Sequence, residues 1–130
     1  MNNIITLIIT FIVAVGGAVG LSGSDQFTKD IQSNVKAVDT VVSGVANSQD
    51  QYRAGSIGVG QYRADCQEAQ RFITRKYQES SNDVTLTEKQ RALNDEYRAY
   101  LMECSKVVTA YQNGDAQDTS RMTELRNKLL

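Results

Sequence analysis

Residues 87–114 read TEKQRALNDEYRAYLMECSKVVTAYQNG, and this stretch decides the fold class. Its apolar residues recur every three or four positions, which is the spacing of one face of an α-helix. Thr87 with Gln90, or Thr85 with Glu88, fits the capping box that begins a helix, and Asn113-Gly114 is typical of a helix end. The sequence therefore predicts a helix over 86–112 with this apolar seam: Leu93, Tyr97, Tyr100 or Leu101, Cys104, Val107 or Val108, and Tyr111.

The rest of the chain after residue 24 has the same helical periodicity. The sequence contains no proline, which would interrupt helices, and its apolar residues do not alternate as in strands. We therefore predict an all-α fold with further helices over 25–54, 61–79 and 118–129. The expected seams are Ile31, Val35, Val38, Val42, Val45 and Tyr52, in a rhythm typical of coiled coils; Tyr62, Cys66, Ala69, Ile73 and Tyr77; and Met122, Leu125 and Leu129.

Two short segments without this periodicity separate the predicted helices. Glycines at 55, 58 and 60 predict a turn, and the tetrapeptide Gln-Tyr-Arg-Ala stands on both sides of it, beginning at residues 51 and 61. A polar loop follows at 79–83. Because that loop joins two long amphipathic helices, 61–79 and 86–112 are expected to form an antiparallel hairpin.

The two cysteines give a specific prediction for the hairpin. If it is symmetric about residue 85, Tyr62 lies opposite Val108, Tyr77 opposite Leu93 and Cys66 opposite Cys104, so both apolar seams are buried together. We therefore predict a disulfide between Cys66 and Cys104, which requires an oxidising compartment. The alternative is two free thiols packed as small apolar side chains.

The N-terminal segment predicts a membrane anchor. Residues 4–21, IITLIITFIVAVGGAVGL, contain no charged side chain, and a helix of that length is roughly 27 Å long, close to the hydrocarbon thickness of a bilayer. We expect residues 1–24 to be a transmembrane anchor and 25–130 to be a helical bundle. The alternative is a cleaved signal peptide, although Met1-Asn2-Asn3 lacks its usual basic residues.

Association and orientation follow from the same region. Gly16 and Gly20 form a G-x-x-x-G pattern, which favours close packing between membrane helices. The expected partners are therefore the lipid bilayer and either copies of this chain or helices of another protein. Lys29 and Lys36 favour a cytoplasmic bundle, but the predicted disulfide favours an extracytoplasmic one, periplasmic or extracellular, or a place in a virion or filament. We predict the extracytoplasmic side.

The composition excludes most catalytic and metal sites. The chain has no histidine, which removes Ser-His-Asp and Cys-His catalysis and histidine metal sites, so we predict no enzyme, cofactor or metal. The carboxylate pairs Asp25/Asp30 and Asp95/Glu96 are expected on solvated helix faces. Five basic residues could suggest nucleic-acid binding, but the net charge is −1 and acidic residues are interleaved with them: Arg53, Arg63, Arg71, Arg75 and Lys76.

These observations predict a single-pass, non-enzymatic structural or assembly protein that acts through helix packing. It could belong to a larger membrane-associated, filament or virion assembly. The alternatives are an exported helical binding module and a channel subunit. No nucleic acid or small-molecule substrate is expected.

Overall fold

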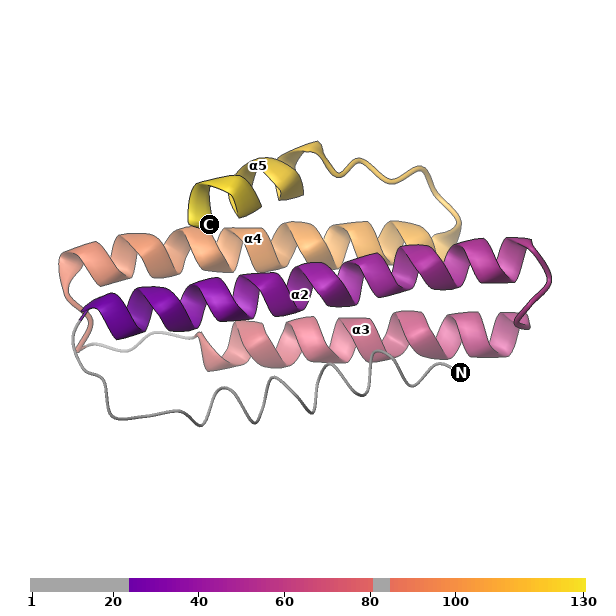
Figure 1. Ribbon diagram of the computed structural model, residues 1–130, viewed down its shortest axis with the longest axis horizontal. Helices are drawn as coiled ribbons and strands as arrows, with labels where there is room; N and C mark the ends of the chain where they lie inside the picture. Colours follow the sequence, from indigo (N-terminus) through magenta and orange to yellow (C-terminus); the bar gives the residue numbers. More distant parts are fainter. Residues whose placement is uncertain (1–23, 81–84) are drawn as a thin grey trace.

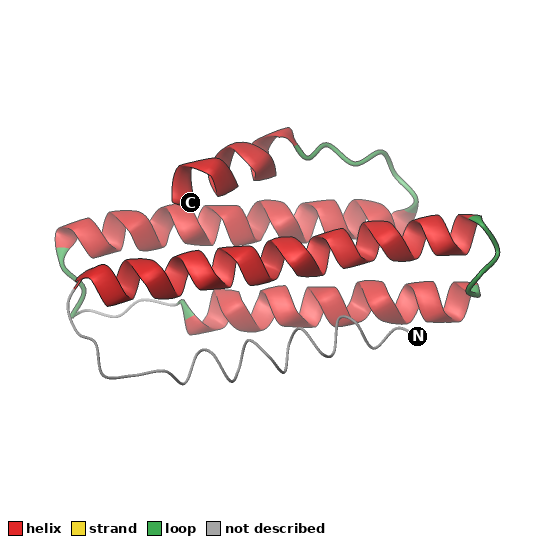
Figure 2. Cartoon of the chain, in the orientation of Figure 1, coloured by secondary structure: helices red, strands yellow, loops and turns green. Residues whose placement is uncertain are grey.

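The protein is all-α over the residues that its computed structural model describes, 24–80 and 85–130 (Figure 2). The four helices of this part are α2 (Ser24–Arg53), α3 (Val59–Glu79), α4 (Glu88–Asn113) and α5 (Ser120–Leu129). Their ends differ from the predicted ones by two residues at most. The periodicity of the apolar residues was therefore sufficient to place every helix in the described part of the chain.

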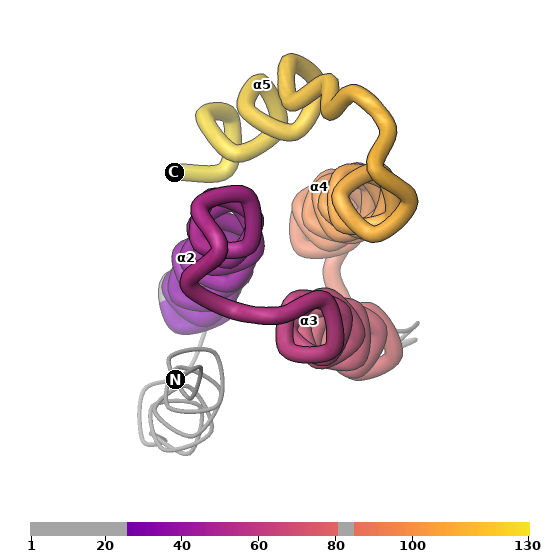
Figure 3. Tube along the Cα trace, turned by 90° about the vertical axis from the view of Figure 1, so that its right-hand side faces the viewer, coloured from indigo at the N-terminus to yellow at the C-terminus, as the bar shows by residue number. Residues whose placement is uncertain are grey.

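Three long helices form the body of the molecule, with α3 antiparallel to both α2 and α4. α2, α3 and α4 run side by side, and the end-on view shows them at the corners of a triangle (Figures 1 and 3). α2 has 30 residues and is about 45 Å long. The short α5 follows a polar loop and packs back against α4 and α2, so it covers the groove between them (Figure 3).

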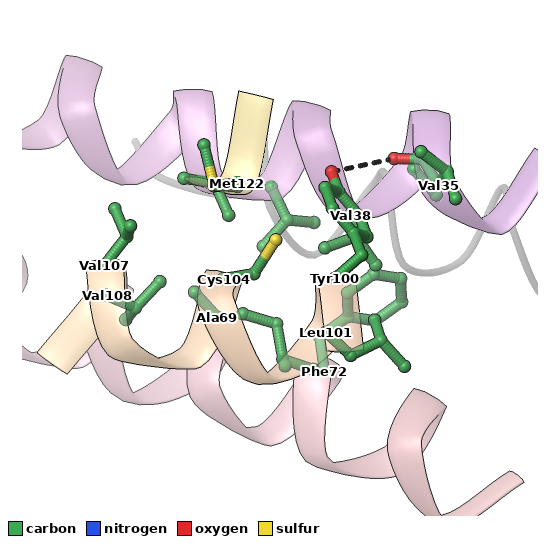
Figure 4. Close-up of a cluster of buried hydrophobic side chains, with 14 of the residues drawn as sticks. Val35, Val38, Ala69, Phe72, Tyr100, Leu101, Cys104, Val107, Val108 and Met122 are labelled. Carbon is green, nitrogen blue, oxygen red and sulfur yellow. Dashed lines mark hydrogen bonds between the residues drawn. The ribbon is translucent and has the colours of Figure 1, made fainter. Parts of the chain in front are cut away.

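The core follows the predicted seams except at Tyr52, which was predicted in the seam of the first helix but is exposed because it lies in the last turn of α2. Val35, Val38 and Val45 of α2 are fully buried, as are Leu101 and Cys104 of α4. Figure 4 shows Val35, Val38, Leu101 and Cys104 meeting between the helices, with Met122 of α5 on one side. Further core residues that the seams omitted are Ala37, Val41 and Phe72. Burial of these apolar side chains makes the largest favourable contribution to the stability of the bundle.

Local sequence sets the helix ends. The Thr87 alternative of the capping box forms: Thr87 Oγ1 accepts a hydrogen bond from the Gln90 amide at 3.1 Å, and Gln90 Oε1 accepts one from the Thr87 amide at 3.0 Å. Gly114 ends α4 with a φ of 75°, a left-handed conformation that glycine adopts without a steric penalty. Gly55, with a φ of 80°, does the same in the turn after α2.

The predicted register of the α3–α4 hairpin is wrong by about one helical turn. In that register Gln70 would face Tyr100, but its side chain bonds the Ser105 carbonyl at 3.0 Å and the Thr109 hydroxyl at 2.7 Å. The Ser80 carbonyl accepts from Asn94 at 2.9 Å. The first turns of α4 therefore extend beyond the end of α3, and the connection is not symmetric about residue 85 (Figure 1).

The predicted Cys66–Cys104 disulfide is not formed, and the register gives the reason. Both cysteines are free and buried. A displacement of one turn separates them by roughly 6 Å along the helices, which carries their Cα atoms beyond the roughly 7 Å that a disulfide can bridge. Figure 4 shows Cys104 pointing from α4 toward α2. The argument from the disulfide to an oxidising compartment therefore loses its basis.

None of the described helices is both long and apolar enough to cross a bilayer. The predicted anchor at 1–24 falls almost entirely outside the described residues, as do Gly16 and Gly20. The transmembrane anchor and the glycine packing face therefore stay predictions.

Candidate functional site at the tip of the bundle

Three helix ends meet at one end of the bundle, which we call the tip. Here α2 ends, α3 begins and α4 ends, so the tip consists of residues 49–63 and 111–114. Figure 3 looks directly onto it. Because helix ends and turns carry less regular packing than helix middles, such a surface is a common place for recognition residues.

A pair of stacked tyrosines forms the centre of the tip. The rings of Tyr52 and Tyr62 are parallel within 6°, with their centroids 5.1 Å apart. Each tyrosine is the second residue of a Gln-Tyr-Arg-Ala copy, and the two copies lie on antiparallel helices at similar distances from the turn. The duplication was visible in the sequence, but its consequence, the stacking of its two tyrosines, was not predicted.

Tyr62 is fixed by hydrogen bonds, whereas Tyr52 is open to solvent. The Tyr62 hydroxyl donates to the Tyr111 carbonyl at 2.8 Å, close to the end of α4, and accepts from Gln49 at 3.4 Å. Burial, followed by the neighbouring Cys66, raises the pKa of Tyr62 to about 12. Tyr52 covers its ring and is 40% exposed. The tip thus presents a preorganised aromatic surface.

A buried carboxylate supports this surface from below. Asp65 is 6% exposed, and its two oxygens accept hydrogen bonds from the Ser48 hydroxyl at 2.7 Å and the Gln61 amide at 3.0 Å. This network joins α2 to α3 beside Tyr62. Asp65 is one of the acidic residues interleaved with the basic residues of this region, and its burial was not predicted. Its spacing of three residues after Tyr62 and four before Ala69, both seam residues, is the signal that could have identified it as buried.

A cavity of about 280 Å³ opens at the tip, and both duplicated arginines line it. Within the described part of the chain, neither Arg53 nor Arg63 forms an ion pair within 4.0 Å. The other lining residues are Gln49, Tyr52, Val59, Tyr62, Cys66, Tyr111, Gln112, Asn113 and Gly114. Tyrosine and arginine are the residue types most enriched in the energetic centres of protein interfaces.

The cysteines are placed for packing. Cys66 borders this cavity but is 0% exposed, and burial raises the pKa of its thiol. Burial raises the pKa of Cys104 to about 12, well above its ordinary value. A thiol acts as a nucleophile or metal ligand in its thiolate form. At neutral pH both cysteines are therefore protonated and act as small core residues.

The other charged residues considered as candidates for metal, acid–base or nucleic-acid sites are dispersed over the surface. Asp30 is exposed and accepts from Gln26, while Glu96 pairs with Lys128 at 3.2 Å. Among residues 24–80 and 85–130, no group of three or more acidic or cysteine side chains could hold a metal ion. Arg71 and Arg75 are exposed along α3, away from the tip.

A second polar cluster, which the sequence analysis missed, lies near the opposite end of the bundle. Lys76 is 8% exposed, contacts Glu79 at 3.4 Å and lies over the Phe72 ring. Asn94 and Tyr97 of α4 border the same cavity of about 190 Å³. The Tyr97 hydroxyl is the one buried side-chain polar atom of the described residues without a hydrogen-bond partner, and Asn34 is its polar neighbour.

Comparison with known proteins gives no relative. No protein-family model, curated protein or solved structure matches this chain.

Proposed function

We propose that this chain is a non-enzymatic, membrane-anchored assembly protein whose helical bundle presents its tip to a partner protein. Residues 1–24 hold the chain in the bilayer, and α2 continues from them as the first helix of the bundle. The observation that carries the proposal is the stacked pair Tyr52 and Tyr62 beside Arg53 and Arg63, which have no ion-pair partner among the described residues. Its other support is the apolar run at 4–21.

The tip suits a partner protein because its exposed groups are those that contribute most to protein interfaces. Tyr52 and Val59 leave apolar surface in solvent, at 40% and 48% exposure, directly beside two arginines. Tyr62 is buried and held in place by its hydroxyl contacts, and Tyr52 is stacked on its ring, so Tyr52 loses little side-chain freedom when a partner covers it. An experiment that locates the contact tests the proposal directly.

Site-specific photo-cross-linking in native membranes locates it. A benzoylphenylalanine replaces Val59 at the tip or, as a control of similar exposure, Met102 on α4, which is 52% exposed. The proposal predicts an adduct of defined mass from position 59, reduced by Tyr52→Ala, and none from position 102. An adduct of twice the chain mass would identify a second copy as the partner. No adduct at position 59, or equal adducts at both positions, would overturn the proposal.

A further inference from the structure

The two arginines that line the tip cavity indicate which kind of chemical group it binds. Arg53 comes from the last turn of α2, and Arg63 from the first turns of α3, so two separate helices bring a guanidinium to one cavity. Both side chains are exposed and neither has an ion-pair partner in the described part of the chain. Two unpaired guanidiniums around a cavity of about 280 Å³ favour an anionic group inside it.

The start of α3 contributes a partial positive charge at the cavity, whereas the last turns of α2 and α4, which also border it, contribute partial negative charge, so its positive character comes from the two arginines. Gly58 is its N-cap and provides no side-chain acceptor, and the first turn has no acidic residue. The first amide groups of a helix point outward and carry a partial positive charge, which here is left without a local carboxylate. Val59, in this first turn, lines the cavity.

Three acidic residues lie near the cavity, Asp50, Asp65 and Asp115, and none of them forms an ion pair within 4.0 Å with Arg53 or Arg63. Asp65 is buried, and both its oxygens are already bonded by Ser48 and Gln61. Asp50 is exposed. Its charge raises the pKa of Tyr111, and the charge of Arg53 lowers it. The arginines therefore keep their hydrogen-bond donors for an external group.

The geometry points to a carboxylate of a partner protein, an acidic side chain or a chain end, bound between Arg53 and Arg63 against the tyrosines. Guanidinium groups hold carboxylates through two parallel hydrogen bonds, and the stacked rings give the adjoining apolar atoms a surface to cover. A nucleic acid is disfavoured because the net charge is −1 and the site is a single cavity, not a basic groove that follows a backbone. This inference rests on the proposed function and names the chemistry of its partner.

Titration of the full chain in detergent micelles with sodium phenylacetate tests the inference. This probe joins a carboxylate to an aromatic ring, and phenylacetamide is its uncharged control. We expect saturable changes in the NMR signals of the Arg53 and Arg63 Nε–H groups with phenylacetate alone. Arg53→Gln or Arg63→Gln should weaken binding about tenfold, because each removes a charge-assisted hydrogen bond. Arg75→Gln, on exposed α3 away from the tip, should leave it unchanged.

Three results would overturn the carboxylate assignment. These are equal binding of phenylacetamide, equal effects of all three arginine substitutions, and tighter binding of inorganic phosphate or of a thymidine oligonucleotide. The photo-cross-link at position 59 does not depend on this chemistry. If it forms while phenylacetate fails, the tip is a protein interface of another kind; if phenylacetate binds while the cross-link fails, the proposed function is wrong and the anion site stands.

Discussion

The hydroxyl groups of Tyr97 and Tyr100 are both buried on α4 but have different surroundings. Tyr100 is 0% exposed and donates to the Val35 carbonyl at 3.3 Å (Figure 4). Tyr97 is 3% exposed, and its hydroxyl has no partner among the described residues. Neighbouring positions on one helix thus offer a matched comparison of a satisfied and an unsatisfied buried polar group.

Replacement of each tyrosine by phenylalanine should have opposite effects. Tyr100→Phe removes a hydrogen bond and should lower the free energy of unfolding by about 1 kcal/mol. Tyr97→Phe removes an unpaired buried hydroxyl and should leave the free energy of unfolding unchanged or raise it by up to about 1 kcal/mol. Urea unfolding in micelles, followed by circular dichroism, measures both. A loss of stability in Tyr97→Phe as large as in Tyr100→Phe would show that Tyr97 is hydrogen-bonded.

Alkaline pH should destabilise the bundle. Burial raises the pKa of Cys104 to about 12, so the folded chain keeps this proton while the unfolded chain releases it near its ordinary pKa of 9.0. Above about pH 9 the unfolded state therefore binds fewer protons, and the free energy of unfolding falls by up to about 1.4 kcal/mol per pH unit for each such group. Tyr62, with a pKa of about 12, adds to the loss above its ordinary value of 10.0.

Urea midpoints between pH 8 and pH 10.5 measure this loss. Cys104→Ala removes one of the titrating groups, so its stability should fall less steeply with pH than that of the native chain. A stability that stays constant across this range would contradict the burial of these groups.

At the residue scale, the sequence predicted the apolar seams but not the buried polar groups. Gln49, Asp65, Lys76 and Asn94 are all buried. Periodicity identifies them only as polar residues, because their burial depends on partners from other helices, such as Ser48 for Asp65. Arg53 and Arg63 were recognised as basic, but their meeting at one cavity depends on the geometry of the α2–α3 turn.

At the element scale, the α3–α4 register has a direct energetic test. Gln70 and Ser105 exchange hydrogen bonds: the Gln70 amide donates to the Ser105 carbonyl, and the Ser105 hydroxyl donates to Gln70 Oε1 at 2.9 Å. In a double-mutant cycle, Gln70→Ala and Ser105→Ala should show a coupling of about 0.5–1.5 kcal/mol in the free energy of unfolding. Gln70→Ala with Lys106→Ala, an exposed neighbour, provides the control. A coupling near zero in the first cycle would contradict this register.

The start of α4 depends on one side chain. Thr87→Ala removes the acceptor for the Gln90 amide and should lower the free energy of unfolding by about 1 kcal/mol. Thr87→Ser keeps an oxygen in the same place and should retain most of the stability. Thermal unfolding of the two variants makes the comparison. Equal melting temperatures for both would show that the cap does not stabilise α4.

Element ends were predictable because their determinants are local. Thr87 with Gln90, and Gly114 after Asn113, lie within one helical turn of the ends that they set. The hairpin register was not predictable in the same way, since burying both seams is compatible with shifts of a whole turn. After a shift of one turn, nearly the same face of each helix still contacts the other helix. Only side-chain pairs such as Gln70 with Ser105 select one of these registers.

At the scale of the whole molecule, the tip lies at the end of the bundle opposite the start of α2. Residues 4–21 provide the apolar run at one end of the sequence, and the tyrosine and arginine tip lies where α2, about 45 Å long, ends. A rigid bundle of this length would hold the tip away from a bilayer surface.

Retention of the N-terminal segment in lipid is the most direct test of the account. The full chain, produced in cells with its native N-terminus, is subjected to vesicle flotation in high salt, and its intact mass is then measured. If residues 1–24 are a retained anchor, we expect a chain of 14.4 kDa that floats with the lipid. A shorter product lacking residues 4–21, or a full-length chain that stays with the unbound protein, would contradict it.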